Sequence, residues 1–251
     1  YDKLRVYKGK IMLLLSTAAD LYWLGRYLNR SCTLLSVLLK AFAQPSREQL
    51  IIPLSLTATG SYFYQQYPEL KDHHLAEFFS DSQNANSITS CLVAIRADAQ
   101  ATRGSLPSQL WLAINKMYLA WQANFVSKMD YAVLLAKYQA LEPELIQVQQ
   151  LIDDLSSDIA LFINLGQSVE ALDNLLRQAF IKQGMPWDEE QGQQLMAQLE
   201  GYIQALSAPI WHKVAESTQQ LRQAMTQKMP VVGLQQHLQQ LTAALTDVFA
   251  S

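Results

Sequence analysis

The chain has 251 residues, of which 50% are hydrophobic and 16% are charged, and its formal net charge is −3. This length and apolar content can form a sizeable core, in one large domain or in two fused bundles. Because no basic excess exists to neutralise phosphates, we expect no nucleic-acid partner. Glycine and proline are sparse, whereas leucine, alanine and glutamine dominate, which favours helix throughout. Cys32 and Cys91 are too few for a disulfide framework and are interpreted as buried thiols of a cytoplasmic protein.

The N-terminal segment has a basic stretch followed by the short apolar run 11–15. A signal peptide needs an apolar region of about 7–15 residues. A membrane span needs about 20, and Asp20 and Arg26 follow too soon for one. We therefore expect no membrane association. We expect Met12 to be the native start and residues 1–11 to be vector-derived or the remnant of an upstream segment.

Apolar residues recur at helical spacing, and no strand-type alternation persists, so we expect an all-α bundle of about eight helices. A capping box at Thr17 and Asp20 is expected to start the first helix, and Ser105 is expected to cap the fourth. Pro53 should bend the second helix or mark its start, and Pro143 should restart the chain. The polar segment 69–86 is predicted to be a loop with a short helix near 75–79. The predicted helices cover about 17–44, 47–67, 87–103, 106–141 with a continuation over 144–155, 157–183, 188–206, 209–228 and 234–249.

The stretch Ala18–Ser31 has a weaker echo at Asp158–Leu172. Aligning Gly25 with Gly166 gives an offset of 166 − 25 = 141 residues, which suggests two pseudo-repeats, roughly 12–141 and 142–251, in one domain over 12–251. A glycine inside a helix costs about 1 kcal/mol of helix propensity. Close approach of another helix is the usual compensation. Our hypothesis is that the two helices cross near their glycines.

Arg26 and Arg30 are four residues apart and lie on the same side of the first helix as Trp23, away from its leucine stripe. The helix is therefore apolar or aromatic nearly all round, which predicts a buried central helix. Buried guanidinium groups need carboxylate partners. Two interpretations stay open: a structural ion-pair network with cation–π contacts, or a groove that binds an anion or a partner. The candidate carboxylates are Asp98, Asp158, Glu170 and Asp173.

Three blocks of the chain resemble the bacterial alpha-E domain family. LYWLGRYLNR, at 21–30, is similar to the family signature LYWLGRYxERA. The block Ser87–Leu119 resembles the family's spaced arginines followed by an LW helix. Asp158–Arg177 resembles its second LGRxxERAD helix. Several charged positions differ from the family pattern, namely Asn29, Ala97, Gln100, Gln167 and Ala171.

The resemblance implies an all-helical protein from operons that also encode a circularly permuted ATP-grasp amide ligase. Transglutaminase-like proteases and a second alpha-E protein often accompany that ligase. The role it implies is a cytoplasmic partner or scaffold of the ligase, as a homo-oligomer or a hetero-oligomer. The candidate core or binding residues are Asp20, Tyr22, Trp23, Gly25, Arg26, Arg30, Arg96, Asp98, Arg103, Asp158, Gly166, Glu170 and Asp173.

No pattern of an enzyme site stands out in the sequence. None of the four histidines has a glutamate three residues before it, as a carboxylate-bridged di-metal bundle requires. The group Asp72–His74 with Glu77 lies in the polar segment, where such side chains are usually solvated. Gly9 and Lys10 lack the remainder of a phosphate-binding loop. We expect no catalytic residue, cofactor or metal. Two alternatives remain open: an enzyme that uses the arginines with Asp98 and Asp158 for amide-bond formation or hydrolysis, and a self-assembling helical scaffold.

Overall fold

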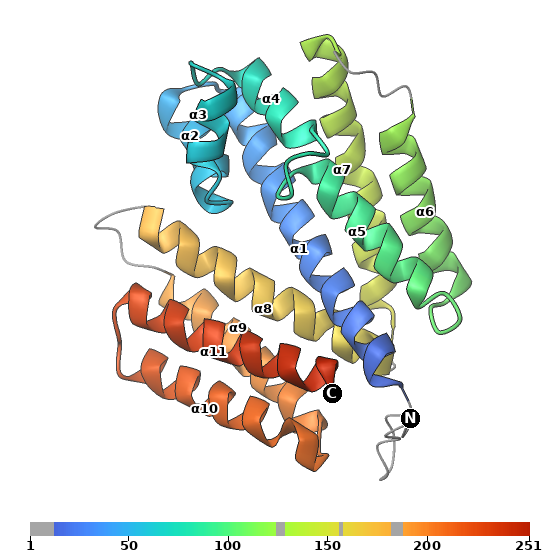
Figure 1. The fold of residues 1–251 in the computed structure, drawn as a ribbon, viewed down its shortest axis with the longest axis vertical. Helices are drawn as coiled ribbons and strands as arrows, with labels where there is room; N and C mark the ends of the chain where they lie inside the picture. The colour runs from blue at the N-terminus through green and yellow to red at the C-terminus, as the bar shows by residue number, and fades with distance from the viewer. Residues whose placement is uncertain (1–12, 124–128, 156–157, 182–187) are drawn as a thin grey trace. The chain divides into compact units, whose positions relative to one another are not determined.

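The computed structural model describes residues 13–123, 129–155, 158–181 and 188–251. In these ranges the chain forms eleven α-helices, one 3₁₀ turn and no strand (Figure 1). The all-α fold class is thus confirmed, whereas the expected number of about eight helices is too low. None of the helices in these ranges combines the length and apolar character that crossing a bilayer requires. The expectation for residues 1–11 lies outside the described ranges.

The chain divides into two compact units. The first comprises residues 1–26 and 155–251, and the second comprises residues 27–154, so the boundary falls inside helix α1, Leu15–Ala43. Neither unit corresponds to one of the two expected pseudo-repeats, because each unit contains residues from both 12–141 and 142–251. The duplication therefore stays a prediction about the two glycine-bearing helices.

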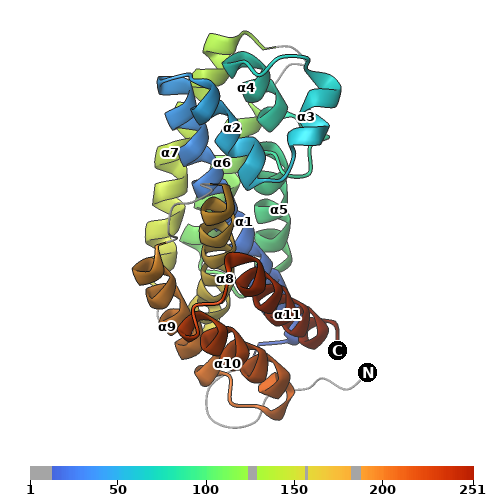
Figure 2. The ribbon, with the colours of Figure 1, turned by 90° about the vertical axis from the view of Figure 1, so that its left-hand side faces the viewer.

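The first unit is built on four long helices that pack in a ring. Helix α8 packs on α9 and α11, and α10 packs on the same two helices, as in a four-helix bundle (Figures 1 and 2). Phe162, Trp211 and Phe249 meet in its core with ring centroids 5.8–6.4 Å apart, and Phe249 also contacts Tyr22. The elements are α8 Asp158–Ile181, α9 Glu189–Ala205, the 3₁₀ turn Pro209–Trp211, α10 His212–Thr226 and α11 Val231–Ala250.

The second unit contains more and shorter helices. Helices α5, α6 and α7 follow one another as packed neighbours, α4 packs on α5 and α7, and α2 packs on α3 (Figure 2). The buried Tyr138 hydroxyl donates to the carbonyl of Ala76 at 2.8 Å, which ties α7 to α4. The elements are α2 Arg47–Leu56, α3 Gly60–Gln66, α4 Asp72–Ser80, α5 Ile88–Ala101, α6 Ser108–Gln122 and α7 Tyr131–Asp153.

The helix expected over 47–67 is divided, and this prediction was wrong. Ala58 has a φ of 55°, in the left-handed region, and the Thr59 N–H donates to the carbonyl of Leu54 at 2.9 Å. These are the features of a Schellman cap, which ends α2. An alanine rather than a glycine occupies the left-handed position, so the usual sequence signal of a helix end is absent. Pro53 lies inside α2 and does not start it.

The helix expected over 106–141 is also divided, into α6 and α7. Asp130 caps α7 by accepting a hydrogen bond from the Ala132 N–H at 2.8 Å. Pro143, expected to restart the chain, lies inside α7. A proline in a helix removes one hydrogen bond at a cost of roughly 3 kcal/mol. The continuous buried stripe of α7, which includes Tyr138, Leu141 and Leu145, stabilises the helix through this position.

Two of the expected helix caps are misplaced. Helix α1 begins at Leu15, and the Ala18 N–H donates to the backbone carbonyl of Leu14, so Thr17 lies inside the helix. Ser105 belongs to a turn in which its N–H donates to the Thr102 carbonyl, and α6 begins only after Pro107. Neither Thr17 nor Ser105 therefore stands at the start of a helix.

Candidate functional site: a buried ion pair at the crossing of α1 and α8

Helices α1 and α8 cross at the two glycines that the sequence singles out. A Cβ atom added to Gly25 would overlap the carbonyl oxygen of Ile163, and one added to Gly166 would overlap the carbonyl oxygen of Tyr22. The contacts are reciprocal, because Ile163 is Tyr22 shifted by the offset of 141 residues. The hypothesis of a glycine crossing is therefore confirmed. At this point the two backbones touch with no side chain between them.

Next to the crossing, Arg26, which directly follows Gly25 in α1, forms an ion pair with Glu170, which lies one turn after Gly166 in α8. Its Nε and Nη2 lie 2.8 and 2.7 Å from the same carboxylate oxygen, Oε2. The side chains are only 8% and 2% exposed. Glu170 is thus the expected carboxylate partner of Arg26. At this depth the pair is held by short, charge-assisted contacts and is little screened by solvent.

Two aromatic side chains enclose the guanidinium group of Arg26. Its Cζ lies 5.4 Å from the ring centroid of Trp23 and 6.0 Å from that of Tyr22. Nη1 donates a long hydrogen bond of 3.5 Å to the Tyr22 hydroxyl. Burial raises the pKa of Tyr22, and the neighbouring Arg26 opposes that rise. The phenol therefore stays protonated at neutral pH and does not act as a base.

A groove of about 450 Å³ opens beside Arg26, between α8 and α11. Its charged groups are already paired: Arg177 Nε lies 3.1 Å from Asp173 Oδ2, and Asp247 Oδ2 lies 2.7 Å from Lys213 Nζ. The hydroxyls of Thr242 and Thr246 donate to carbonyls of their own helix. The residues that line the groove are Arg26, Asp173, Arg177, Leu238, Gln239, Thr242, Ala243, Thr246 and Asp247.

This arrangement suits binding better than catalysis. The groove lining offers arginines, aspartates, hydroxyls and one amide, but no histidine or cysteine that could exchange a proton near neutral pH. A polar or zwitterionic group could be held there by hydrogen bonds to Gln239 and the outer nitrogens of Arg177. Across the described residues, no group of three or more His, Cys, Asp or Glu side chains is placed to hold a metal ion.

The other predicted residues divide between the two units. Asp20 and Asp158 belong to the first unit and are partly exposed; burial raises the pKa of Asp20. Asp98 is partly buried in α5 of the second unit. Asp173, a candidate partner for Arg26 or Arg30, is paired with Arg177 instead.

Three predicted arginines of the second unit stack on aromatic rings. The distances from Cζ to the ring centroid are 5.6 Å for Arg30 over Tyr27, 4.8 Å for Arg96 over Tyr118 and 5.2 Å for Arg103 over Trp111. The contact of Arg30 is the kind that the structural interpretation of the first helix includes, whereas the sequence indicated no such contact for Arg96 or Arg103.

The wall of the groove that α11 supplies, and Arg177 on α8, were not among the residues predicted from the sequence. The Asp173–Arg177 spacing of four residues is a helix ion-pair signal that could have been found. The residues that α11 contributes to the groove carry no such signal. Gln239, Thr242 and Thr246 are polar residues of the kind found on any solvent-exposed helix face.

A family model, Alpha-E, matches residues 13–223 and is described as a predicted alpha-helical domain with a conserved ER motif. The chain belongs to the Alpha-E family. Neither the curated proteins nor the solved structures contain a significant match to it.

This Alpha-E chain contains no Glu-Arg dipeptide anywhere in its sequence. Asn29 precedes Arg30 in the first glycine-bearing helix, and Ala171 follows Glu170 in the second. The structure brings together a glutamate and an arginine from the two different helices, in the Arg26–Glu170 pair. Here an ion pair between helices joins the two residue types that the family's motif names.

Proposed function

We propose that this Alpha-E chain is a non-catalytic partner or scaffold of an ATP-grasp peptide or amide ligase system in the cytoplasm, with a second Alpha-E protein as a further partner. The ligase association comes from the family resemblance of its three sequence blocks. The observation that carries the non-catalytic role is the Arg26–Glu170 pair, in which the most buried arginine of the signature helix is neutralised inside the fold. Such a pair orders a helix crossing and leaves no reactive group exposed.

The test is a reconstitution with the ligase encoded beside this chain, in which the amide product is measured by mass spectrometry. We expect the two proteins to co-purify and product formation to require both of them. The decisive variant is the double substitution Arg26→Met/Glu170→Leu, which replaces the ion pair by apolar groups of similar size. Replacements of this kind are often neutral or stabilising. The proposal predicts that this variant, folded by circular dichroism, supports the ligase as well as the parent does.

Three results would contradict the proposal. Product formation by this chain alone would make it an enzyme. Full ligase activity in its absence would remove the partner role. A folded Arg26→Met/Glu170→Leu protein that still binds the ligase but yields no product would assign chemistry to the pair.

The groove beside α11 supports a second candidate, in which the chain binds a substrate for the ligase. Arg177 lines the groove, its side chain is 40% exposed and it contacts Asp173 through Nε, which leaves its outer nitrogens as donors to a carboxylate. Arg177→Gln distinguishes the two roles. A scaffold role predicts unchanged product formation at limiting peptide concentration, whereas a substrate-binding role predicts a raised KM at constant kcat.

A further inference from the structure

Helix α5 with the turn that follows it, and helix α6, carry two repeated arginine–aromatic contacts in the second unit. Arg96 stacks on Tyr118 and Arg103 stacks on Trp111. The arginines are seven residues apart, and so are the aromatic residues, in the opposite chain direction. The two contacts therefore repeat along the antiparallel pair of helices. On α6 the two rings are separated by roughly 10 Å along the helix axis, from a rise of about 1.5 Å per residue.

These two arginines differ from the paired arginines of the chain. Arg26, Arg177 and Arg222 each form an ion pair with a carboxylate. Within the described residues Arg103 makes only its contact with Trp111, and Arg96 adds one hydrogen bond, from Nε to Asn115 Oδ1 at 3.0 Å. An aromatic ring supports each guanidinium group, and the Asn115 amide also holds that of Arg96, while no carboxylate of the described residues pairs with either group. A fixed guanidinium fork is suited to bidentate binding of a carboxylate.

The surrounding charges do not neutralise the two arginines. Residues 88–122 contain Arg96, Arg103 and Lys116 against the single acid Asp98, a formal charge of 3 − 1 = +2 in a chain of net charge −3. Asp98 lies two residues after Arg96, which places it about 200° around α5 from that arginine. Lys116 is paired with Glu144 of α7 at 2.9 Å. With Lys116 paired in this way, Arg96 and Arg103 against Asp98 leave a formal charge of 2 − 1 = +1 on this part of the chain.

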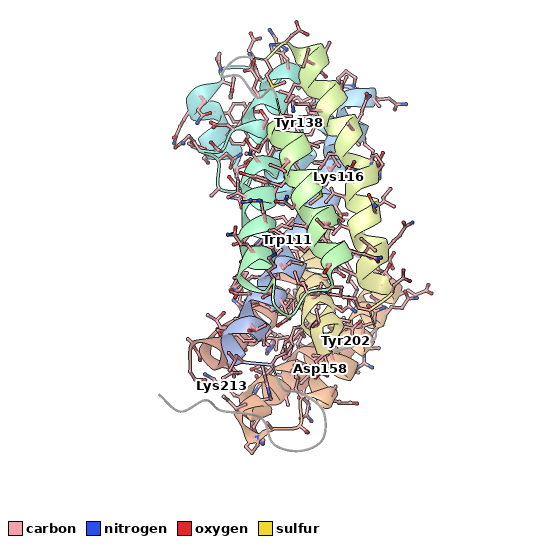
Figure 3. All side chains as sticks on the ribbon, turned by 90° about the vertical axis from the view of Figure 1, so that its right-hand side faces the viewer. Trp111, Lys116, Tyr138, Asp158, Tyr202 and Lys213 are labelled. Carbon is pink, nitrogen blue, oxygen red and sulfur yellow. The ribbon has the colours of Figure 1, made fainter. Side chains whose placement is uncertain are left out.

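Exposed apolar side chains flank both contacts. Leu112 follows Trp111 and is 61% exposed, and Leu119 follows Tyr118 and is 54% exposed. Trp111 and Lys116 of α6 are labelled in Figure 3. Each of the two contacts thus combines an arginine stacked on an aromatic ring with an exposed leucine that follows that ring in the sequence.

We propose that this arginine–aromatic face, formed by Arg96, Arg103, Trp111, Tyr118, Leu112 and Leu119, binds an acidic amphipathic helix of a partner protein. Carboxylates seven residues apart on that helix are separated by about 10 Å, which matches the spacing of the two aromatic rings that support the arginines. Leucines beside those carboxylates meet Leu112 and Leu119. Nucleic acid fits less well, since two arginines are too few to neutralise an extended phosphate backbone. The proposal holds whether or not the partner is a ligase.

The test uses a fluorescein-labelled helical peptide with two glutamates seven residues apart and leucines at the adjacent positions, measured by fluorescence anisotropy. We expect it to bind the parent chain. In the variant Arg96→Gln/Arg103→Gln its Kd should rise about tenfold or more, because two charge-assisted contacts are lost. Arg96→Lys/Arg103→Lys keeps the charges and loses the planar fork, so it should also bind more weakly than the parent.

The matched control is Arg47→Gln/Lys71→Gln, which removes two exposed charges elsewhere in the second unit. It should bind as the parent does. Circular dichroism confirms that each variant is folded, and the lysine variant decides the question if the glutamine variant unfolds. The proposal is overturned if the peptide does not bind, if a lysine version of the peptide binds equally well, or if the control loses as much affinity. Equal competition by a twenty-nucleotide oligothymidylate would assign the face to nucleic acid instead.

Discussion

At the residue scale, Arg26 acts as an internal ion rather than as a surface ligand group. A guanidinium with 8% of its side chain exposed is stable only with a partner, and Glu170 supplies it at 2.7 Å. Trp23 and Tyr22 fill the space around the guanidinium. The residue therefore orders the packing around it, and removing its charge alone would leave a buried carboxylate unpaired.

The thiol of Cys32 gives a prediction at the same scale. Burial raises its pKa from 9.0 to about 11. At pH 8 the thiolate fraction therefore falls about a hundredfold, from roughly 10% to roughly 0.1%. In a Cys91→Ala background, we expect iodoacetamide to alkylate the folded protein about a hundredfold more slowly than the protein in urea. Equal rates in the two states would show that the thiol is open to solvent.

The same shift makes the stability depend on pH. Because the folded-state pKa lies above the unfolded value, the folded state holds the proton between pH 9 and 11 and the unfolded state releases it. The contribution of Cys32 to stability is therefore complete below pH 9 and is lost as the pH rises toward 11.

At the element scale, the crossing of α1 and α8 depends on two missing side chains. Glycine costs about 1 kcal/mol of helix propensity relative to alanine. At Gly25 this cost is offset by contact between the two backbones, which a Cβ would prevent. Gly201, inside α9, provides the contrast, because a Cβ there would meet no atom within 4 Å.

Substitution of these glycines should therefore have opposite effects. Gly25→Leu should lower the free energy of unfolding by more than about 2 kcal/mol, because the backbones must separate. Gly201→Ala should raise it by about 0.5–1 kcal/mol. Urea unfolding followed by circular dichroism measures both changes. A Gly25→Leu protein as stable as the parent would contradict the crossing.

The sequence predicted this crossing more fully than it predicted the helix ends. Gly25 and Gly166 interrupt strongly apolar helices, so their role at a crossing could be inferred. Glu170 was one of four carboxylates that the sequence offered as partners for the arginines. The end of α2 was missed because Ala58 adopts a conformation that usually marks glycine. The groove was missed because periodicity shows which side of α11 is polar but not that Arg177 lies across from it.

At the scale of the whole molecule, the chain combines a low net charge with two separate groups of arginines. In the first unit the arginines of the groove are neutralised by carboxylates, which favours packing. In the second unit Arg96 and Arg103 stack on aromatic rings and form no ion pair with a described carboxylate, which favours contact with a partner. A scaffold needs both features: a core that sets the fold and a surface that recognises another protein.

The non-catalytic role depends most on whether Arg26 and Glu170 form a structural ion pair that is closed to solvent. A double-mutant cycle with Arg26→Met, Glu170→Leu and both substitutions together, measured by urea unfolding, tests it directly. Each single substitution should cost about 3–5 kcal/mol, because it leaves a buried charge unpaired. The double substitution should lie within about 1 kcal/mol of the parent or above it. Single substitutions that cost less than about 1 kcal/mol and add up in the double variant would contradict the account, because the two charges would then be solvated and free to bind a ligand.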